Sequence, residues 1–109
     1  MIRPIAFCAG LALASAAQAQ SLCVNGHPVP RSSHVTYGYV HCSAGYVRDH
    51  KTPLCGGGPD IAENIRCEEY GESKIKDGEE REWCEAMCRG DVTAPELQRH
   101  FHDKWDGKP

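Results

Sequence analysis

Strand-forming residues of this 109-residue chain are concentrated in its first half, where residues 35–40 are mostly β-branched or aromatic. Such a run is typical of a strand, residues 43–45 are suited to a turn, and residues 46–48 to a returning strand. The pattern therefore predicts a β-hairpin between residues 35 and 48. Residues 25–33 are rich in turn formers, and we expect them to be irregular.

A first helix is expected from Asp60. Asp60 and Glu63 fit a capping box, in which each side chain accepts a hydrogen bond from the other residue's backbone amide. Gly71 is placed to end this helix, because glycine readily adopts the left-handed conformation of a helix C-terminus. Residues 73–76 are expected to form a short edge strand.

A second helix is expected to open near Asp77 and to stop at Gly90. Its apolar residues recur at helical spacing and form one stripe. The members of this stripe are Trp83, Cys84, Met87 and Cys88.

A third helix is expected from Thr93, with Pro95 in its first turn. Apolar residues then recur every four positions, as in an amphipathic helix. They are Leu97, Phe101 and Trp105. The elements together predict an α+β fold: a small disulfide-stapled domain in which a β-hairpin is followed by two or three short helices.

Residues 1–19 have the pattern of a secretory signal peptide. Arg3 precedes an apolar run, and Ala17 and Ala19 suit the cleavage pocket of signal peptidase. Cleavage there would leave residues 20–109 as a single disulfide-rich domain and would reduce seven cysteines to six. We therefore expect a secreted, extracellular protein whose thin apolar core depends on disulfides.

Six cysteines remain after this cleavage, and they permit fifteen pairings. They are Cys23, Cys42, Cys55, Cys67, Cys84 and Cys88. Cys84 and Cys88 lie on one helical face, so each is expected to bridge a different segment. One is expected to reach the hairpin through Cys42, and the other the loop at Cys55 or the helix at Cys67. Excluding a bridge between Cys84 and Cys88 leaves twelve pairings.

Metal binding by Cys84, Cys88 and a nearby histidine is the alternative to these disulfides. Zinc sites usually combine two closely spaced cysteine pairs, and export exposes thiols to oxidation. We therefore expect neither a metal nor another cofactor.

The charge balance limits the expected partners. The chain has a formal charge of −3, which becomes −4 without Arg3. A net-acidic protein gains little from counterion release on nucleic acids or on anionic membranes. The apolar run near the N-terminus is too short to span a bilayer. We expect a monomer that binds no nucleic acid and does not insert into membranes.

The chain has six histidines, and the spacing of five of them places no two on a common face. His100 and His102 lie two positions apart on a predicted helix, so they diverge. His27, His34 and His41 recur every seven residues, but in a loop and at strand ends. We expect surface histidines that titrate near neutral pH.

No contiguous catalytic motif is present, so we expect no enzymatic activity and name no catalytic residue. The alternative is a secreted hydrolase in which His41 or His100 and an acid such as Glu63 cleave a phosphodiester or glycosidic bond. Residues 56–58 are three glycines, but they lack the lysine and hydroxyl residue of a phosphate-binding loop. We interpret them as a flexible turn.

Two segments are candidate interaction sites. Prolines stiffen the chain before Arg31, which could enter the specificity pocket of a trypsin-like protease. Glu68, Glu69 and Glu72 could form an acidic docking face for a basic partner, whose on-rate would fall with salt. The simpler interpretation of these acids is a solvated face at a helix N-terminus.

The signal pattern ending at Ala19, the short remaining chain and its six cysteines resemble the small secreted cysteine-rich proteins of fungi, many of which act as effectors. The resemblance concerns the format of the whole chain and transfers no functional residue. It implies a non-enzymatic, effector-like protein that binds a host or competitor protein or glycan outside the cell. A protease inhibitor presenting Arg31 and an antimicrobial or killer toxin are the alternatives.

Overall fold

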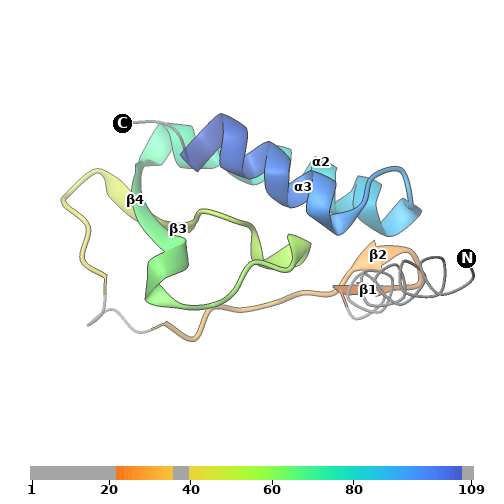
Figure 1. Cartoon of the computed structure of the whole chain (residues 1–109). Coiled ribbons are helices and arrows are strands. Elements are labelled where there is room, and N and C mark those ends of the chain that lie inside the picture. Colours follow the sequence, from red (N-terminus) through yellow and green to blue (C-terminus); the bar gives the residue numbers. More distant parts are fainter. Residues whose placement is uncertain (1–21, 36–39, 107–109) are drawn as a thin grey trace, which may run out of the picture.

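The computed structural model describes residues 22–35 and 40–106 of the chain (Figure 1). The predicted signal peptide, residues 1–19, lies outside the described residues, as do residues 36–39 of the predicted first strand. The described part is an α+β fold, as the sequence predicts. Two small antiparallel hairpins accompany a long helix and a short helix, and three disulfides connect these elements.

The first hairpin joins β1 (Cys23–Val24) to β2 (His27–Pro28). Asn25 and Gly26 form its turn, with φ of 52° and 77°. Positive φ at both central positions is what a tight two-residue hairpin turn requires, and Asn-Gly is the commonest pair there. The expectation of an irregular segment was therefore wrong at its N-terminal end.

The second hairpin pairs β3 (Tyr46–His50) with β4 (Ile65–Glu69), with Tyr46 opposite Glu69 and His50 opposite Ile65. The predicted partner of this strand was residues 35–40, most of which lie outside the described residues. A helix was predicted where β4 lies, and this prediction was wrong. Local patterns favoured a short loop and a helix cap, whereas the observed pairing joins segments separated by residues 51–64.

Two short 3₁₀ helices, η1 (Leu54–Gly56) and η2 (Ala62–Asn64), lie between β3 and β4. The Asp60 carboxylate makes no capping box. It accepts hydrogen bonds from Ser33, His34 and His50 instead. These tertiary bonds outweigh the local cap that the sequence pattern favours.

Helix α2 (Tyr70–Arg89) contains 20 residues and begins earlier than predicted. The Glu69 carboxylate caps it by accepting bonds from the amides of Gly71 and Glu72. Gly71 is therefore in the first turn rather than at a helix end, and the predicted edge strand at 73–76 is part of α2. The predicted stop is confirmed, because Gly90 adopts φ of 87° and caps the helix C-terminus.

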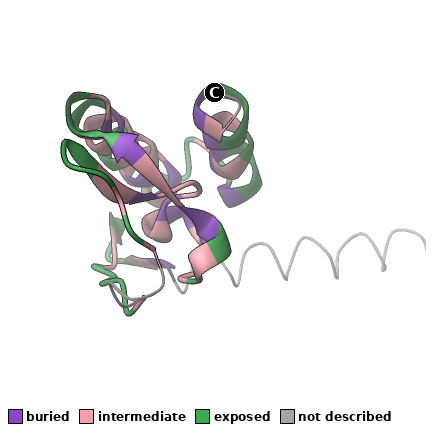
Figure 2. Cartoon of the chain, turned by 90° about the vertical axis from the view of Figure 1, so that its left-hand side faces the viewer, coloured by how far each residue is buried: buried purple, intermediate pink, exposed green. Residues whose placement is uncertain are grey.

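Helix α3 (Ala94–Phe101) begins where predicted. Thr93 and Glu96 form a capping box, and Pro95 lies in the first turn. A π-helical turn, η3 (His102–Asp106), continues from it. Leu97, Phe101 and Trp105 are at most 1% exposed and form the centre of the core. The core also contains Cys84 and Met87 of α2, and both helices carry buried as well as exposed residues (Figure 2).

The three disulfides are Cys23–Cys88, Cys42–Cys67 and Cys55–Cys84. Cys84 and Cys88 bridge different segments, as predicted, and Cys55 is one of the predicted partners. The predicted bridge from this helix to Cys42 was wrong. Cys88 lies at the end of α2 that adjoins the first hairpin, whereas β3–β4 lies at the other end (Figure 1).

None of the helices among the described residues is long and apolar enough to cross a membrane.

Candidate functional site

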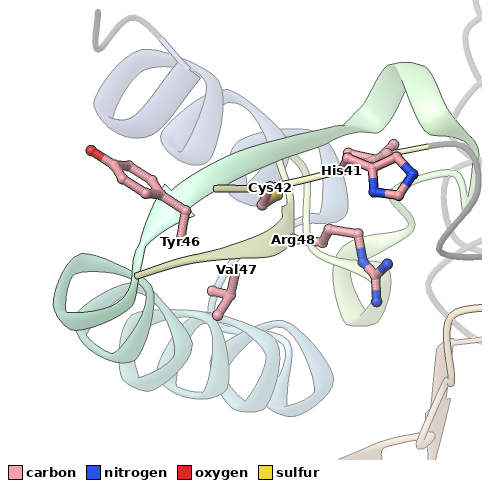
Figure 3. A pocket seen from close by; sticks show the side chains of 6 residues that line it. His41, Cys42, Tyr46, Val47 and Arg48 are labelled. Carbon is pink, nitrogen blue, oxygen red and sulfur yellow. The ribbon is translucent and has the colours of Figure 1, made fainter. Parts of the chain in front are cut away.

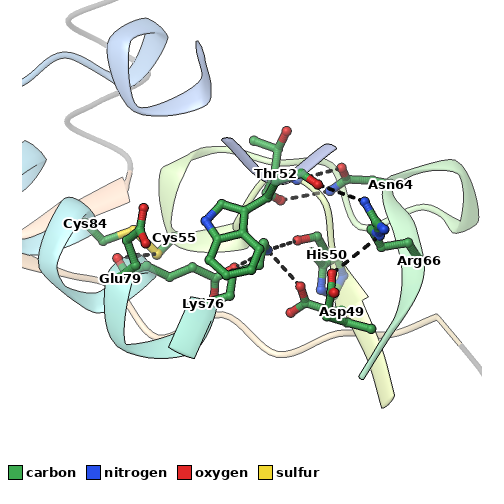
Figure 4. Close-up of polar contacts among 12 residues, drawn as sticks. Asp49, His50, Thr52, Cys55, Asn64, Arg66, Lys76, Glu79 and Cys84 are labelled. Carbon is green, nitrogen blue, oxygen red and sulfur yellow. Dashed lines mark hydrogen bonds and ion pairs between the residues drawn. A yellow bond between two sulfur atoms is a disulfide. The ribbon is translucent and has the colours of Figure 1, made fainter. Parts of the chain in front are cut away.

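A pocket of about 230 Å³ lies where the end of β3, the η1 turn and α2 meet. Charged, polar and apolar side chains line it together. These are Arg31, Asp49, His50, Pro53, Leu54, Cys55 and Glu80. Figure 4 shows the polar contacts around it, with Asp49 and His50 on β3 and Lys76 reaching them from α2. We take this pocket as the candidate functional site because it combines concave shape with several titratable groups.

Strand geometry separates the two neighbouring residues at the end of β3. Successive side chains of a strand point to opposite faces. Asp49 accordingly contacts Lys76 on α2, whereas His50 contacts Asp60 in the connection between the strands. One strand end thus supplies a group to each side of the pocket.

The connection between β3 and β4 is fixed by Asn64, which is 8% exposed. The Asn64 side chain accepts a bond from the Thr52 amide and donates to the carbonyl groups of Thr52 and Pro59. The glycines fit closely, because a Cβ atom at Gly58 would overlap the Thr52 carbonyl. Residues 56–58 do form a turn, but it is packed rather than free, and it holds Asp60 in a defined position.

His50 and Asp60 form a hydrogen-bonded pair, with 2.9 Å between His50 Nε2 and Asp60 Oδ1. The His34 amide, with smaller contributions from His50 and Ser33, lowers the pKa of Asp60 to about 2. Asp60 is therefore a carboxylate at neutral pH and must accept a hydrogen bond from the Nε2–H group of His50. A neutral imidazole has one donor and one acceptor nitrogen. The lone pair is then on Nδ1, for which the described residues provide no hydrogen-bond partner.

Lys76 connects α2 to the end of β3. Its side chain is fully buried, and its Nζ atom lies 2.8 Å from Asp49 Oδ2 and 2.7 Å from Glu80 Oε2. Nζ also donates to the His50 carbonyl at 2.6 Å. These contacts fix the backbone of His50 as well as the carboxylate of Asp49.

The charges in this cluster do not balance. Burial acts to lower the pKa of Lys76, but the carboxylates of Glu80 and Asp49 outweigh it and raise that pKa. Burial raises the pKa of Asp49, and it raises the pKa of Glu80 to about 7. Asp77 lies close to both acids and adds repulsion. The lysine therefore stays charged, while Glu80 retains its proton up to near-neutral pH.

The raised pKa of Glu80 predicts how the stability of the protein depends on pH. An ordinary glutamate titrates near 4.5, and Glu80 in the folded protein near 7. Between these values the folded protein holds a proton that the unfolded chain has released, so stability falls as pH rises through this range. The expected loss of stability is about 3 kcal/mol. Urea unfolding between pH 4.5 and 8 should show this loss of stability in the wild type. The profile of stability against pH should be flatter in Glu80→Gln. Glu82→Gln, at an exposed position of α2, should keep the wild-type slope, and an unchanged slope in Glu80→Gln would contradict the assignment.

Arg31 is not presented as a free side chain. Its Nη1 atom donates to the carbonyls of Leu54 and Gly58, so the guanidinium lies against the η1 turn and lines the pocket. A residue that enters a protease specificity pocket has to project away from its own protein. The observed contacts place Arg31 in the candidate site, and because the residue is exposed, its role on an inhibitory loop stays a prediction.

The three candidate docking acids do not share one exposed face. Glu68 is 6% exposed and lies 3.5 Å from the Arg66 guanidinium. Glu69 faces the opposite side of β4 and caps α2, and Glu72 lies in the first turn of that helix. The expected acidic face was wrong for Glu68, because strand alternation turns this side chain inward.

His41 and His100, the two histidines considered for acid–base catalysis, do not line a pocket with Glu63. His100 pairs with Glu79 and stacks on Trp83, with ring centroids 4.0 Å apart. His41 lines a separate hollow of about 380 Å³ at the other side of β3. Figure 3 shows His41 beside Arg48 there, with Tyr46 pointing away. No acid lines this hollow among the described residues, so it lacks a partner for acid–base chemistry.

The sequence analysis missed His50, Asp60 and Lys76 as site residues. The predicted strand stopped at Arg48, so Asp49 and His50 were not assigned to any element, and Asp60 was assigned to a helix cap. The available signal was an Asp-His pair directly after an apolar strand, with a glycine turn and an asparagine following it. Comparison with known families, curated proteins and solved structures finds no match for this chain.

Proposed function

We propose that this chain is a small secreted hydrolase that cleaves phosphodiester bonds, with His50 as its general base. The observation that carries the proposal is the His50–Asp60 pair at the wall of the pocket. An ionised acid that accepts from one imidazole nitrogen orients the ring and leaves the other nitrogen free to take a proton. Three disulfides in a small domain are typical of extracellular proteins, which fits a secreted enzyme.

Water is the nucleophile in this proposal. The six cysteines of the described chain are all in disulfides, so none can act as a thiolate. The Ser33 hydroxyl contacts the pair, but its Oγ donates to Asp60 instead of to His50. A histidine base without a side-chain nucleophile activates a water molecule directly.

The pocket is less suited to two other classes of hydrolysis. Acyl transfer needs donors for an oxyanion, but the amides of Gly56, Gly57 and Gly58 all donate to backbone carbonyls. Glycoside hydrolysis needs two carboxyl groups that flank the substrate, but Lys76 ties Asp49 and Glu80 together.

A phosphodiester is favoured by the cation in the pocket wall. Arg31 uses only Nη1 in its two backbone bonds, and a guanidinium has five N–H donors. The remaining donors match the geometry of phosphate oxygens. Because the whole chain is net acidic, we expect short phosphodiesters rather than long nucleic acids as substrates.

The test is hydrolysis of bis(p-nitrophenyl) phosphate by oxidised protein comprising residues 20–109. p-Nitrophenyl acetate and p-nitrophenyl β-glucoside, with the same leaving group, serve as controls for acyl and glycosyl transfer. The proposal predicts turnover of the phosphodiester above the buffer rate and no comparable effect on the other two. No acceleration of the phosphodiester would refute it.

A second function is favoured by a separate observation. Tyr46 and Tyr70 are 49% and 54% exposed, and the Tyr70 amide bonds to Gly45 beside Tyr46. Exposed tyrosines frequently anchor protein interfaces. They support an effector-like interaction protein, as the resemblance to fungal secreted proteins implies. In a pull-down from host extracellular extract, this function predicts a captured protein that is lost with Tyr46→Ala/Tyr70→Ala but retained with His50→Gln.

A further inference from the structure

The three acids beside the pocket have the arrangement of a cation site. Asp49, Asp77 and Glu80 each direct one oxygen toward the others, and these oxygens lie within 4.8 Å of one another. Hard divalent cations prefer such carboxylate oxygens. A cluster of this kind is strained unless a positive charge compensates for the mutual repulsion of its members.

Lys76 already supplies a positive charge to this cluster. Its side chain is fully buried, with Nζ 2.8 Å from Asp49 Oδ2 and 2.7 Å from Glu80 Oε2. The third contact of Nζ is the His50 carbonyl at 2.6 Å. Nζ therefore donates hydrogen bonds to Glu80 and to the His50 carbonyl, and it forms an ion pair with Asp49. Figure 4 shows this convergence of β3 and α2 on one nitrogen.

We propose that Lys76 is a built-in cation that occupies the place a divalent metal ion would take among these carboxylates. The chain accordingly binds no divalent cation at this cluster. For catalysis the inference rests on the proposed function and specifies its cation: hydrolysis in the pocket proceeds with Lys76 as a positioning residue. Lys76 holds Asp49 and the backbone of His50, and a chelator cannot remove it.

The inference makes a reciprocal prediction about the variant without this charge. Lys76→Ala keeps a residue that favours helix but leaves three carboxylates around an empty volume. A divalent cation can then enter and restore the charge balance. A ligand that binds only the folded state raises the melting temperature in a concentration-dependent manner.

Thermal unfolding of wild type and Lys76→Ala, with EDTA or with millimolar Mg²⁺, Ca²⁺ or Mn²⁺, tests this prediction. The wild-type melting temperature should not depend on these additions. Lys76→Ala should melt well below wild type in EDTA and regain about 5 °C or more with at least one cation. Asp49→Asn/Lys76→Ala/Glu80→Gln, which lacks two ligands, should show no such recovery. Lys74→Ala removes an exposed lysine of the same helix and should behave as wild type in all conditions.

Mn²⁺ binding to wild type, followed by electron paramagnetic resonance, decides the matter even if Lys76→Ala does not fold. A stoichiometric Mn²⁺ ion that Asp49→Asn/Glu80→Gln removes would overturn the inference, and so would a folded Lys76→Ala that no cation stabilises. The absence of such an ion in wild type supports it. These readouts need no turnover, so a failure of the proposed hydrolase activity would leave their outcome unaffected. If the protein is active, turnover that EDTA abolishes would contradict the role of Lys76.

Discussion

Exchange of both Cys55 and Cys84 for serine is expected to lower the free energy of unfolding by about 3.5 kcal/mol and to abolish turnover. The two cysteines are 29 positions apart, and opening a loop of this length increases the entropy of the unfolded chain by that order. Cys55 also lines the pocket, and its disulfide ties the η1 turn to α2. The carbonyls that hold Arg31 belong to this turn and the glycines after it.

The Cys42→Ser/Cys67→Ser variant is the matched control. Its loop has a similar separation of 25, so the expected destabilisation is again about 3.5 kcal/mol. This disulfide does not line the pocket. Denaturant unfolding should give similar losses of unfolding free energy for the two variants. Below both melting temperatures, the Cys42→Ser/Cys67→Ser variant should retain turnover, and the Cys55→Ser/Cys84→Ser variant should not. Equal activity in the two variants would contradict the position assigned to the site.

His50→Gln is expected to reduce kcat for phosphodiester hydrolysis by a factor of about 100 or more, which is the usual contribution of a general base. Glutamine can still donate to Asp60 but cannot accept a proton from water at neutral pH. Because Asp60 keeps its bonds to Ser33 and His34, we expect the folded structure to persist.

His102→Gln is the control for this substitution, because the side chain of His102 is 76% exposed and lies outside the pocket. Steady-state kinetics with bis(p-nitrophenyl) phosphate, together with circular dichroism, separates loss of catalysis from loss of fold. Full activity in a folded His50→Gln protein would remove His50 from the mechanism.

Local signals in the sequence predicted the end of α2 and the whole of α3 well. Each of the signals used there lies within one or two helical turns. They are the cap at Thr93, the stop at Gly90, and the recurrence every four residues of Leu97, Phe101 and Trp105. The pairing of β3 with β4 was missed because it depends on contacts across the connection between them. A cap at Asp60 matched the local pattern equally well, and only the contacts with residues 33, 34 and 50 favour the observed conformation.

The candidate site was hardly predictable, because its parts come from four separate segments of the chain. Arg31 was identified, but as a contact for a protease, since nothing nearby in the sequence indicates the turn on which it lies. Lys76 was placed in an edge strand. Its full burial, which usually indicates a paired charge, is evident only from the structure. The acid–base chemistry considered for His41 or His100 is proposed here for His50, which strand pairing brings to Asp60.

The protonation of the His50 ring tests the account most directly, because the proposed chemistry requires a free Nδ1. Nitrogen-15 NMR of the imidazole side chains at pH 8.5, where histidines are ordinarily neutral, distinguishes the two tautomers, and His50→Gln assigns the signal. We predict a proton on Nε2, bonded to Asp60, and an unprotonated Nδ1. A proton on Nδ1 would contradict the role of His50 as the base.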